Sequence, residues 1–409
     1  MPDELALSAT RLSPARRIII AAFGMDLAVA TVGLSVQFSG HALDATPTML
    51  GLLATAGATA YTVLCLFTGR FSDVFGRRLL TSLACVLCAG VWLVMPFTTR
   101  SWHLLALMPL SGAGIAMFWP ATQAWLAEVT RGGRKGLAAN LGSFNISWTV
   151  GLMLGPPLAG VMWQFGRPAP FLLASAGVLL VLGLMRTVPT VRRQAEEPEA
   201  ADEDPVDSRV AEHYLRLAWV ANSASWFARG LVGVAFPKLG KELGLSEQLI
   251  GIIIAALLGG QLAMFAFLRK RTGWQYRLWP LVAAELVGCV GMMVAFLARA
   301  PLIFASGLAL AGVCAGMTYV ASLFYSLQGR SAGRGGRAGI HEAVLGSGMV
   351  LGPLLGGLVA NYVDLRSPFL VAAAVFLLVA AVDLVMWRRT IWPTRLRDRT
   401  VARAEVAGQ

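Results

Sequence analysis

Five ionisable residues stand inside long apolar stretches of this sequence: Asp26, Arg229, Glu285, Glu342 and Asp383. A charge is costly in an apolar environment, so each of these residues is a candidate functional group. A carboxyl group in a medium of low dielectric can exchange a proton within the physiological pH range. A guanidinium group in such a place suits a carboxylate or a phosphate. Proton transfer and anion binding are therefore the chemistry that these residues indicate.

Two of these candidates have a competing explanation that the sequence leaves open. Asp26 is the best candidate for a proton carrier, but it could instead form a structural ion pair with Arg229. His341 directly precedes Glu342, and histidine can relay protons at neutral pH.

No set of residues typical of an enzyme active site can be recognised in the sequence. The four histidines are scattered, so no metal site is expected. No phosphate-binding loop and no nucleophile with a neighbouring base can be recognised, and no cofactor is expected. The cysteines are interpreted as small buried hydrophobic residues, since all of them fall in apolar stretches, including a C-x-x-C pair that lacks a second ligand pair. They are Cys65, Cys85, Cys88, Cys289 and Cys314.

The composition predicts that lipid surrounds the elements that carry these residues. Of the 409 residues, 56% are hydrophobic and 14% are charged, against about 25% charged in an average soluble domain. A helix needs about 20 mostly apolar residues to cross a bilayer. Twelve such runs predict an all-α polytopic membrane protein. They lie near 17–38, 46–68, 78–98, 102–126, 136–163, 169–187, 213–236, 247–268, 278–298, 301–327, 337–361 and 367–388.

The basic residues predict an orientation. Of the 34 Lys and Arg residues, 27 fall at the termini and in the even-numbered loops, and 6 fall in the odd-numbered loops. By the positive-inside rule both termini are cytoplasmic, with the chain in the plasma (inner) membrane. Because these residues flank apolar runs and do not form one stripe, the net charge of +12 does not indicate a nucleic-acid partner.

One long polar segment divides the chain near its midpoint. Residues 188–212 are rich in charge and proline, which predicts a flexible cytoplasmic linker. The expected parts are then a tail (1–16), a six-helix bundle (17–187), the linker, a second six-helix bundle (213–388) and a basic tail (389–409). The polar first residues carry no recognisable cleavable signal.

A glycine pattern occurs once in each predicted bundle. Glycines at x3 spacing let a partner helix approach closely, and the proline bends the helix. Because 197 residues separate Gly151 from Gly348, the pattern indicates a duplicated unit. The fifth run holds Gly142, Gly151, Gly155, Pro156 and Gly160, and the eleventh holds Gly339, Gly348, Gly352, Pro353, Gly356 and Gly357.

The loop after the second run reads Gly69-x3-Asp73-x2-Gly76-Arg77-Arg78. Together with the duplicated glycine pattern, it resembles the major facilitator superfamily over the whole chain. The fifth-run pattern is similar to that of the drug:proton antiporter branch. The resemblance implies two six-helix bundles around a central cavity that opens to each side in turn.

The resemblance assigns expected roles to the loop. It implies that Asp73 lies near the start of the eleventh span, where the helix dipole attracts an anion, and that the loop forms a gating latch. A gating contact with this latch would explain His341 and Glu342 as well as a proton relay does. Two departures limit the comparison. Met108 stands where relatives often carry an arginine in the fourth span, and Lys270 stands where the second-half loop would match Asp73.

The resemblance also places spans 1, 4, 7 and 10 around the cavity, and spans 9 and 12 at the periphery. Glu285 and Asp383 are therefore not expected in the pathway, and Asp383 could pair with Arg388. Aromatic rings in the lining spans could stack a drug or hold a cation, although packing alone would also explain them. The expected cavity residues are Arg229, Asn222, Trp226, Phe118, Trp119, Tyr319, Phe324 and Tyr325.

The function expected from these features is that of a monomeric proton-coupled antiporter, which exports a hydrophobic or amphipathic small molecule. Two alternatives stay open. A nutrient or metabolite carrier would suit Arg229, whose guanidinium could bind an anionic substrate. A non-transporting membrane sensor on the same fold is disfavoured because no further folded domain is evident in the linker or tails.

Overall fold

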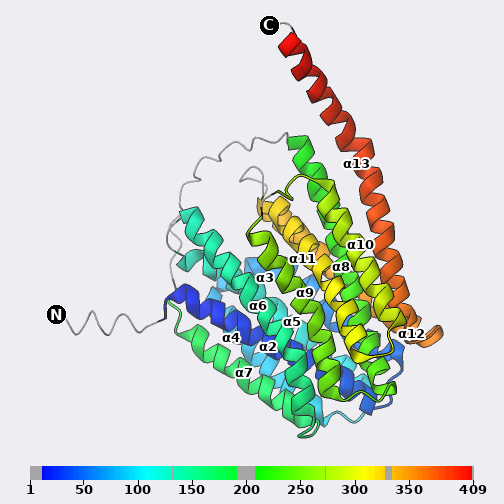
Figure 1. Ribbon diagram of the computed structural model, residues 1–409. Coiled ribbons are helices and arrows are strands. Elements are labelled where there is room, and N and C mark those ends of the chain that lie inside the picture. The colour runs from blue at the N-terminus through cyan, green and yellow to red at the C-terminus, as the bar shows by residue number, and fades with distance from the viewer. Residues whose placement is uncertain (1–11, 131–132, 191–207, 272, 328–333, 408–409) are drawn as a thin grey trace, which may run out of the picture. The chain divides into compact units, whose positions relative to one another are not determined.

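The computed structural model describes residues 12–130, 133–190, 208–271, 273–327 and 334–407 (Figure 1). Within these ranges the chain is helical, as the composition predicts. Twelve long helices account for the predicted runs, and a short 3₁₀ turn, η1 (Met95–Phe97), follows the third. They are α2 (Pro14–Ala42), α3 (Pro47–Phe75), α4 (Arg77–Val94), α5 (Ser101–Val129), α6 (Gly133–Trp163), α7 (Pro168–Arg186), α8 (Ser208–Glu242), α9 (Glu247–Arg269), α10 (Leu278–Leu297), α11 (Pro301–Leu327), α12 (Arg334–Tyr362) and α13 (Ser367–Ala407).

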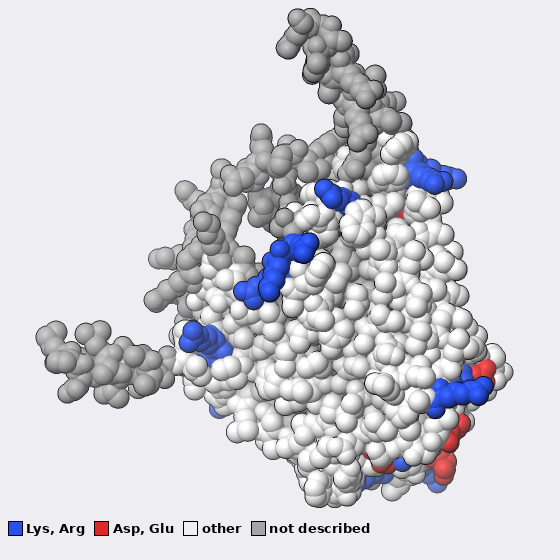
Figure 2. All heavy atoms as spheres, viewed as in Figure 1, with Lys and Arg blue, Asp and Glu red and all other residues white. Residues whose placement is uncertain are grey.

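The surface of these helices suits a lipid environment. Among the described residues, 11 helices are long and apolar enough to cross a membrane. The remaining long helix, α8, carries polar residues such as Asn222, Ser223 and Ser225 that lower its mean hydropathy. On the face shown in Figure 2, Lys, Arg, Asp and Glu leave a broad uncharged area. The predicted class, a polytopic all-α membrane protein, is confirmed.

Local sequence explains where several helices begin. The side chains of Ser13 and Thr46 accept hydrogen bonds from the backbone N–H groups three residues further on, and a proline follows each cap. This is the arrangement that satisfies the free donors of a first helical turn. Between α3 and α4, Gly76 takes φ +89°, a conformation that glycine adopts without a Cβ clash. The loop glycine is thus required by the backbone itself.

The chain forms two compact units. The first comprises residues 1–195 and 240–255, and the second comprises residues 196–239 and 256–409. In the first unit α2 packs against α6 and α7, and α5 packs against α3 and α4. In the second unit α10 packs against α11 and α13, and α12 also contacts these two helices.

Two helices extend into the predicted linker and tail. α8 begins at Ser208, so residues 208–212 are helical. α13 continues to Ala407, well beyond the predicted end of the last span at 388, although its apolar part is Ser367–Thr390. The extension is rich in arginine and alanine, which have high helix propensity, so the helix can continue past its apolar part.

Candidate functional site

Asp26 lies in a tight seam between α2 and α6. Its side chain is 5% exposed. A Cβ atom built on Gly151 of α6 would come within 2.9 Å of the Leu27 backbone nitrogen and 3.3 Å of the Asp26 Cβ. Further along, the Thr31 hydroxyl donates to the carbonyls of Leu27 (2.7 Å) and Gly155 (3.3 Å). The glycines of α6 therefore lie where the backbone of α2 approaches, and Asp26 is buried in that contact.

The second unit contains an equivalent seam between α8 and α12. A Cβ on Gly348 would lie 2.7 Å from the Ser223 carbonyl oxygen and 2.7 Å from the Phe227 nitrogen. In the first unit Gly151 meets the corresponding atoms of Phe23 and Leu27. The first and seventh spans are thus related by an offset of 200 residues, the difference between 23 and 223. With this offset Asp26 corresponds to Trp226.

The other glycines of the duplicated pattern divide into two groups. Added Cβ atoms would crowd partner backbones at Gly155, Gly160, Gly352 and Gly356. Pro156 and Pro353 lie inside α6 and α12, as expected, and Gly357 is buried. At Gly142 a Cβ would meet nothing within 4 Å, so the described residues show no packing partner there, and its expected packing role stays a prediction. It precedes the part of α6 that contacts α2. At Gly339 the structure describes the helix but not what surrounds the residue.

Three of the expected cavity residues lie together on α8. The Arg229 guanidinium carbon is 4.8 Å from the centroid of the Trp226 ring, a cation–π contact between residues three apart on the helix. Asn222, one turn earlier, is fully buried. Neither atom of its amide has a hydrogen-bond partner among the described residues. A buried amide without partners is costly, so Asn222 is a candidate to bind a polar group.

His341 belongs to a polar network that the sequence interpretation missed. Its Nδ1 lies 2.8 Å from the Ser322 hydroxyl of α11, its ring stacks edge-on with Tyr319, and its Nε2 has no partner among the described groups. The hydroxyls of Ser326 and Thr318, one turn to either side on α11, bond Trp219 (3.0 Å) and Ser225 (2.8 Å) of α8. The sequence signal that could have revealed this network is the i, i+4, i+8 spacing of the hydroxyl residues Thr318, Ser322 and Ser326.

The remaining aromatic candidates pack within the units. Phe118 is fully buried and meets Trp119 edge-on, and Trp119 in turn meets Phe144. The Tyr325 hydroxyl accepts the backbone N–H of Tyr276 at 2.8 Å, and Phe324 stacks with Trp274. These contacts give Phe118, Phe324 and Tyr325 packing partners within their units, and their expected cavity role stays a prediction.

The loop signature forms an ion-pair network inside the first unit. The Arg77 guanidinium pairs with Asp73 and with Glu128 of α5, and it also donates to the Ser72 hydroxyl. Arg78 donates to the Val188 carbonyl at 2.7 Å. Gly69 has open space around its Cα. The predicted contact of Asp73 with the eleventh span joins the two units, and it stays a prediction.

Glu285 and Asp383 form a second acidic site, on α10 and α13. Both side chains are fully buried, and none of their carboxyl oxygens has a hydrogen-bond partner of ordinary geometry among the described residues. The two carboxyl groups are close neighbours. The expected pairing of Asp383 with Arg388 is wrong, because five residues along a helix turn the two side chains to different faces. At Glu342 the structure describes the helix but not the side chain.

A sequence model of the Major Facilitator Superfamily matches residues 18–327 and 218–407. The two matches cover nearly the whole chain, and they agree with the twelve-helix fold and the loop network. The protein is therefore a membrane transporter and belongs to the Major Facilitator Superfamily.

Its relatives include transporters of several kinds. The tetracycline resistance protein, class H, of Pasteurella multocida is 24% identical over 260 residues, which are 59% of this chain and 63% of that protein. The quinolone resistance protein NorA of Staphylococcus aureus (strain MRSA252) is 29% identical over 34% of this chain and 35% of its own length. The inner membrane metabolite transport protein YgcS of Escherichia coli (strain K12) is 28% identical over 42% of this chain and 39% of its own length. Each match thus spans less than two thirds of the relative.

Solved structures share the fold over more of the chain. A bacterial homologue of the human lysosomal transporter Spinster, inward-facing and occupied, has a TM-score of 0.74 at 14% identity, over 92% of this chain and 96% of its own. The nucleoside transporter NupG has a TM-score of 0.71 at 10% identity, over 92% of this chain and 99% of its own. At such identities the likeness shows the fold alone.

Proposed function

We propose that this transporter is a proton-coupled antiporter that exports a hydrophobic or amphipathic small molecule. The observation that carries the proposal is the burial of Asp26 in the α2–α6 seam, where Gly151 leaves the helices in close contact. A carboxyl group in such a place exchanges its proton only when its surroundings change, and alternating access supplies that change. The tetracycline and quinolone resistance relatives support export of drug-like molecules.

His341 is the second proposed proton group. It is 3% exposed, and one ring nitrogen is held by Ser322 while the other has no partner among the described residues. A histidine in this arrangement can accept a proton on the open nitrogen while its tautomer is fixed by the hydroxyl. Glu342 remains a candidate for the same role from its sequence position.

We also propose that both termini face the cytoplasm and that the transporter acts in the plasma membrane as a monomer. The distribution of basic residues supports this orientation.

The test is transport by Asp26→Asn protein in proteoliposomes, with a fluorescent cationic drug as substrate. Downhill exchange should persist, but uphill movement driven by a proton gradient should vanish, because nothing is left at residue 26 to titrate. Normal uphill transport by well-folded Asp26→Asn protein would refute the assignment. The matched control is Asn145→Asp, which adds a carboxyl group on α6 and should not restore coupling in the Asp26→Asn background.

The companion variant addresses the structural alternative. If Asp26 and Arg229 act only as an ion pair, each single change should impair folding, and the double variant Asp26→Asn/Arg229→Gln should recover it. Independent effects on stability would instead support separate roles.

A second candidate function is the uptake or exchange of an anionic metabolite. The Arg229 guanidinium over Trp226 and the unpartnered amide of Asn222 could together bind a carboxylate or a phosphate. The relative YgcS is called a metabolite transport protein. If organic anions, and not cationic drugs, exchange across the proteoliposome membrane and Arg229→Gln abolishes this, the second function holds.

A further inference from the structure

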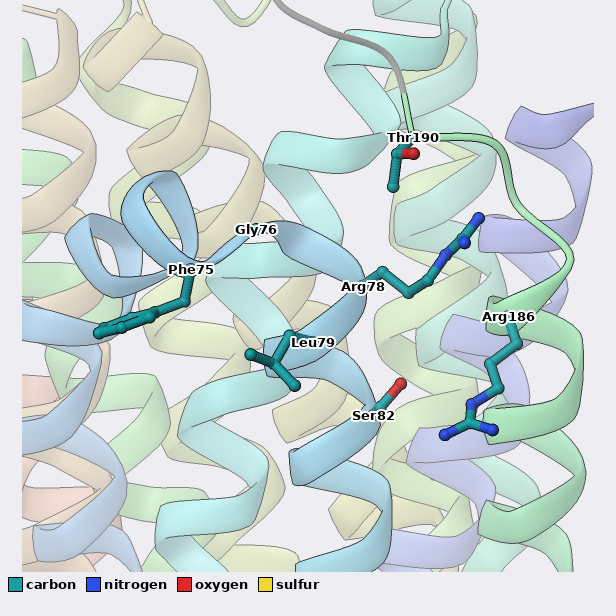
Figure 3. A pocket seen from close by; sticks show the side chains of 7 residues that line it. All are labelled: Phe75, Gly76, Arg78, Leu79, Ser82, Arg186 and Thr190. Carbon is teal, nitrogen blue, oxygen red and sulfur yellow. The ribbon is translucent and has the colours of Figure 1, made fainter.

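The first unit has a recess at the end where α4 begins and α7 ends. It has a volume of about 590 Å³, and Phe75, Gly76, Arg78, Leu79, Ser82, Arg186 and Thr190 line it (Figure 3). This volume lies within the range of small-molecule sites, about 300–1,000 Å³. α4 forms one wall of the recess. The last turn of α7 and the chain segment that follows it form the other.

Two arginines make the recess cationic. Arg186 extends from the last turn of α7 toward α4, and Arg78 extends from the first turn of α4 toward the chain after α7 (Figure 3). Arg78 uses one nitrogen to bond the Val188 carbonyl at 2.7 Å, so its position is fixed and its other N–H groups remain. Within the described part of the chain, neither guanidinium forms an ion pair. The acidic residue nearest in sequence, Asp73, is already paired with Arg77.

The same recess continues into apolar surface. Phe75 is 61% exposed and Leu79 is 50% exposed. Along the outer face of α4, Leu83 and Val86 are also about half exposed, and Leu180 of α7 is more exposed still. These residues belong to helices that are apolar enough to cross a membrane. Exposed apolar side chains on such helices suit contact with lipid chains, and the two arginines lie at the end of this apolar surface.

We propose that this recess binds the phosphate-containing headgroup of an anionic phospholipid, with its acyl chains along α4 and α7. Arginine forks match phosphate oxygens with two hydrogen bonds, and Ser82 offers a further donor. Basic recesses between membrane helices are suited to anionic headgroups. The lining by both charge and exposed apolar side chains selects a lipid over a free phosphate, which would leave Phe75 and Leu79 in contact with a charged ligand. The site is separate from Asp26 and does not depend on the proposed substrate.

The competing occupant is a segment of this chain. Residues 196–207 contain seven acidic residues and follow Thr190 closely in sequence. Their charge suits Arg78 and Arg186, but none of the seven acidic side chains offers an apolar group to cover Leu79. The lipid is therefore favoured, and the experiment separates the two.

The experiment is native mass spectrometry of the full chain in detergent, titrated with phosphatidylglycerol, phosphatidylcholine or glycerol phosphate. Wild-type protein should retain phosphatidylglycerol in preference to phosphatidylcholine. The variant Arg78→Gln/Arg186→Gln should lose this preference by about tenfold or more, since each basic residue near a headgroup contributes about 1 kcal/mol. The control, Arg388→Gln/Arg389→Gln, makes the same change of charge at exposed positions of α13 and should keep the preference.

Further variants decide among the other outcomes. Leu79→Asn should weaken phosphatidylglycerol binding but not glycerol phosphate binding, which separates a lipid site from a phosphate site. If the double variant unfolds, Arg186→Gln alone tests the site, since Arg186 is exposed. Equal loss in the control, or no loss in the recess variants, would overturn the proposal. So would a lipid preference that appears only after the seven acidic residues are changed to Asn and Gln, because the linker would then be the occupant.

Discussion

The Nε atom of Arg77 donates to Oε1 of Glu128 at 3.1 Å and so joins the first turn of α4 to the last turn of α5. The two residues are 51 positions apart. Their side chains are 11% and 18% exposed, so this is a shielded ion pair, unlike the largely exposed Asp73 on the other side of the guanidinium. Arg77 therefore has a structural partner within its own unit, in addition to any gating contact.

The pair predicts that Arg77 cannot be replaced by lysine. Lysine has no planar fork and cannot hold Glu128, Asp73 and the Ser72 hydroxyl together. Arg77→Lys and Arg77→Ala should both lower the melting temperature, by an amount equivalent to about 1–3 kcal/mol for the shielded carboxylate left without a partner. Scanning fluorimetry would measure this. In a double-mutant cycle with Glu128→Gln the two losses should not add. Additive losses would mean that the pair contributes nothing.

The two glycine seams predict a matched result in the two units. Gly151→Leu and Gly348→Leu should prevent stable folding, because backbone atoms of the partner helix already lie within 3 Å of where a Cβ would stand. Gly142→Leu is the control on the same helix, since a Cβ there meets nothing within 4 Å. It should fold and transport normally. Size-exclusion profiles would show the outcome, and a well-folded, active Gly151→Leu protein would contradict the seam.

In the described part of each unit, one arginine holds the end of a preceding helix by two hydrogen bonds, and these two arginine clamps predict parallel losses of stability. Arg167 donates to the Thr98 carbonyl (2.8 Å) and hydroxyl (2.7 Å), and Arg366 donates to the carbonyls of Phe296 (2.8 Å) and Ala298 (2.7 Å). Such bonds from a charged donor contribute about 1.5–3 kcal/mol. Arg167→Ala and Arg366→Ala should each lower the melting temperature.

The stability that the Arg167 clamp contributes should not vary with pH. Partial burial lowers the pKa of Arg167, but an arginine keeps its charge at any pH that the protein tolerates. The difference in melting temperature between wild type and Arg167→Ala should therefore be the same at about pH 5 and pH 9. A difference that disappears at the higher pH would show that another group holds this junction.

The buried acidic pair predicts that neutral side chains are tolerated. An ionised carboxylate without hydrogen bonds costs several kcal/mol in an apolar interior, so Glu285 and Asp383 cannot both be charged there. Glu285→Gln and Asp383→Asn should preserve the melting temperature or raise it, and the double variant should differ from the sum of the two. Loss of folding in both neutral variants would show that the charges are needed.

The proposed orientation predicts the accessibility of the first residue of α8. In a background without the native cysteines, Ser208→Cys should react with an impermeant maleimide only after cells are opened. A cysteine at Arg100, in the loop before α5, should react in intact cells. The reverse pattern would contradict the cytoplasmic placement of the termini.

Several features of the fold could be predicted from the sequence because they depend on local composition. The long apolar runs determine the helices, since a bilayer requires that backbone groups be satisfied within each segment. The repeated glycines determine that α6 and α12 make close contacts, and the Gly76 turn follows from a conformation that only glycine adopts readily. The extension of α13 past its apolar part was not predicted because hydropathy marks where a membrane span ends, not where a helix ends.

The partners of individual side chains were decided by tertiary structure. Whether Arg77 meets Glu128, or Ser322 meets His341, depends on how each helix is rotated about its axis, and each residue turns a side chain by about 100°. Asp383 illustrates the difference: its sequence neighbour Arg388 is charged and near, yet helix rotation turns the carboxyl group toward α10. Gly142 lies in the same pattern as Gly151 but beyond the crossing of α2 and α6. A linear sequence records spacing along a helix, whereas contact requires a second helix at that position.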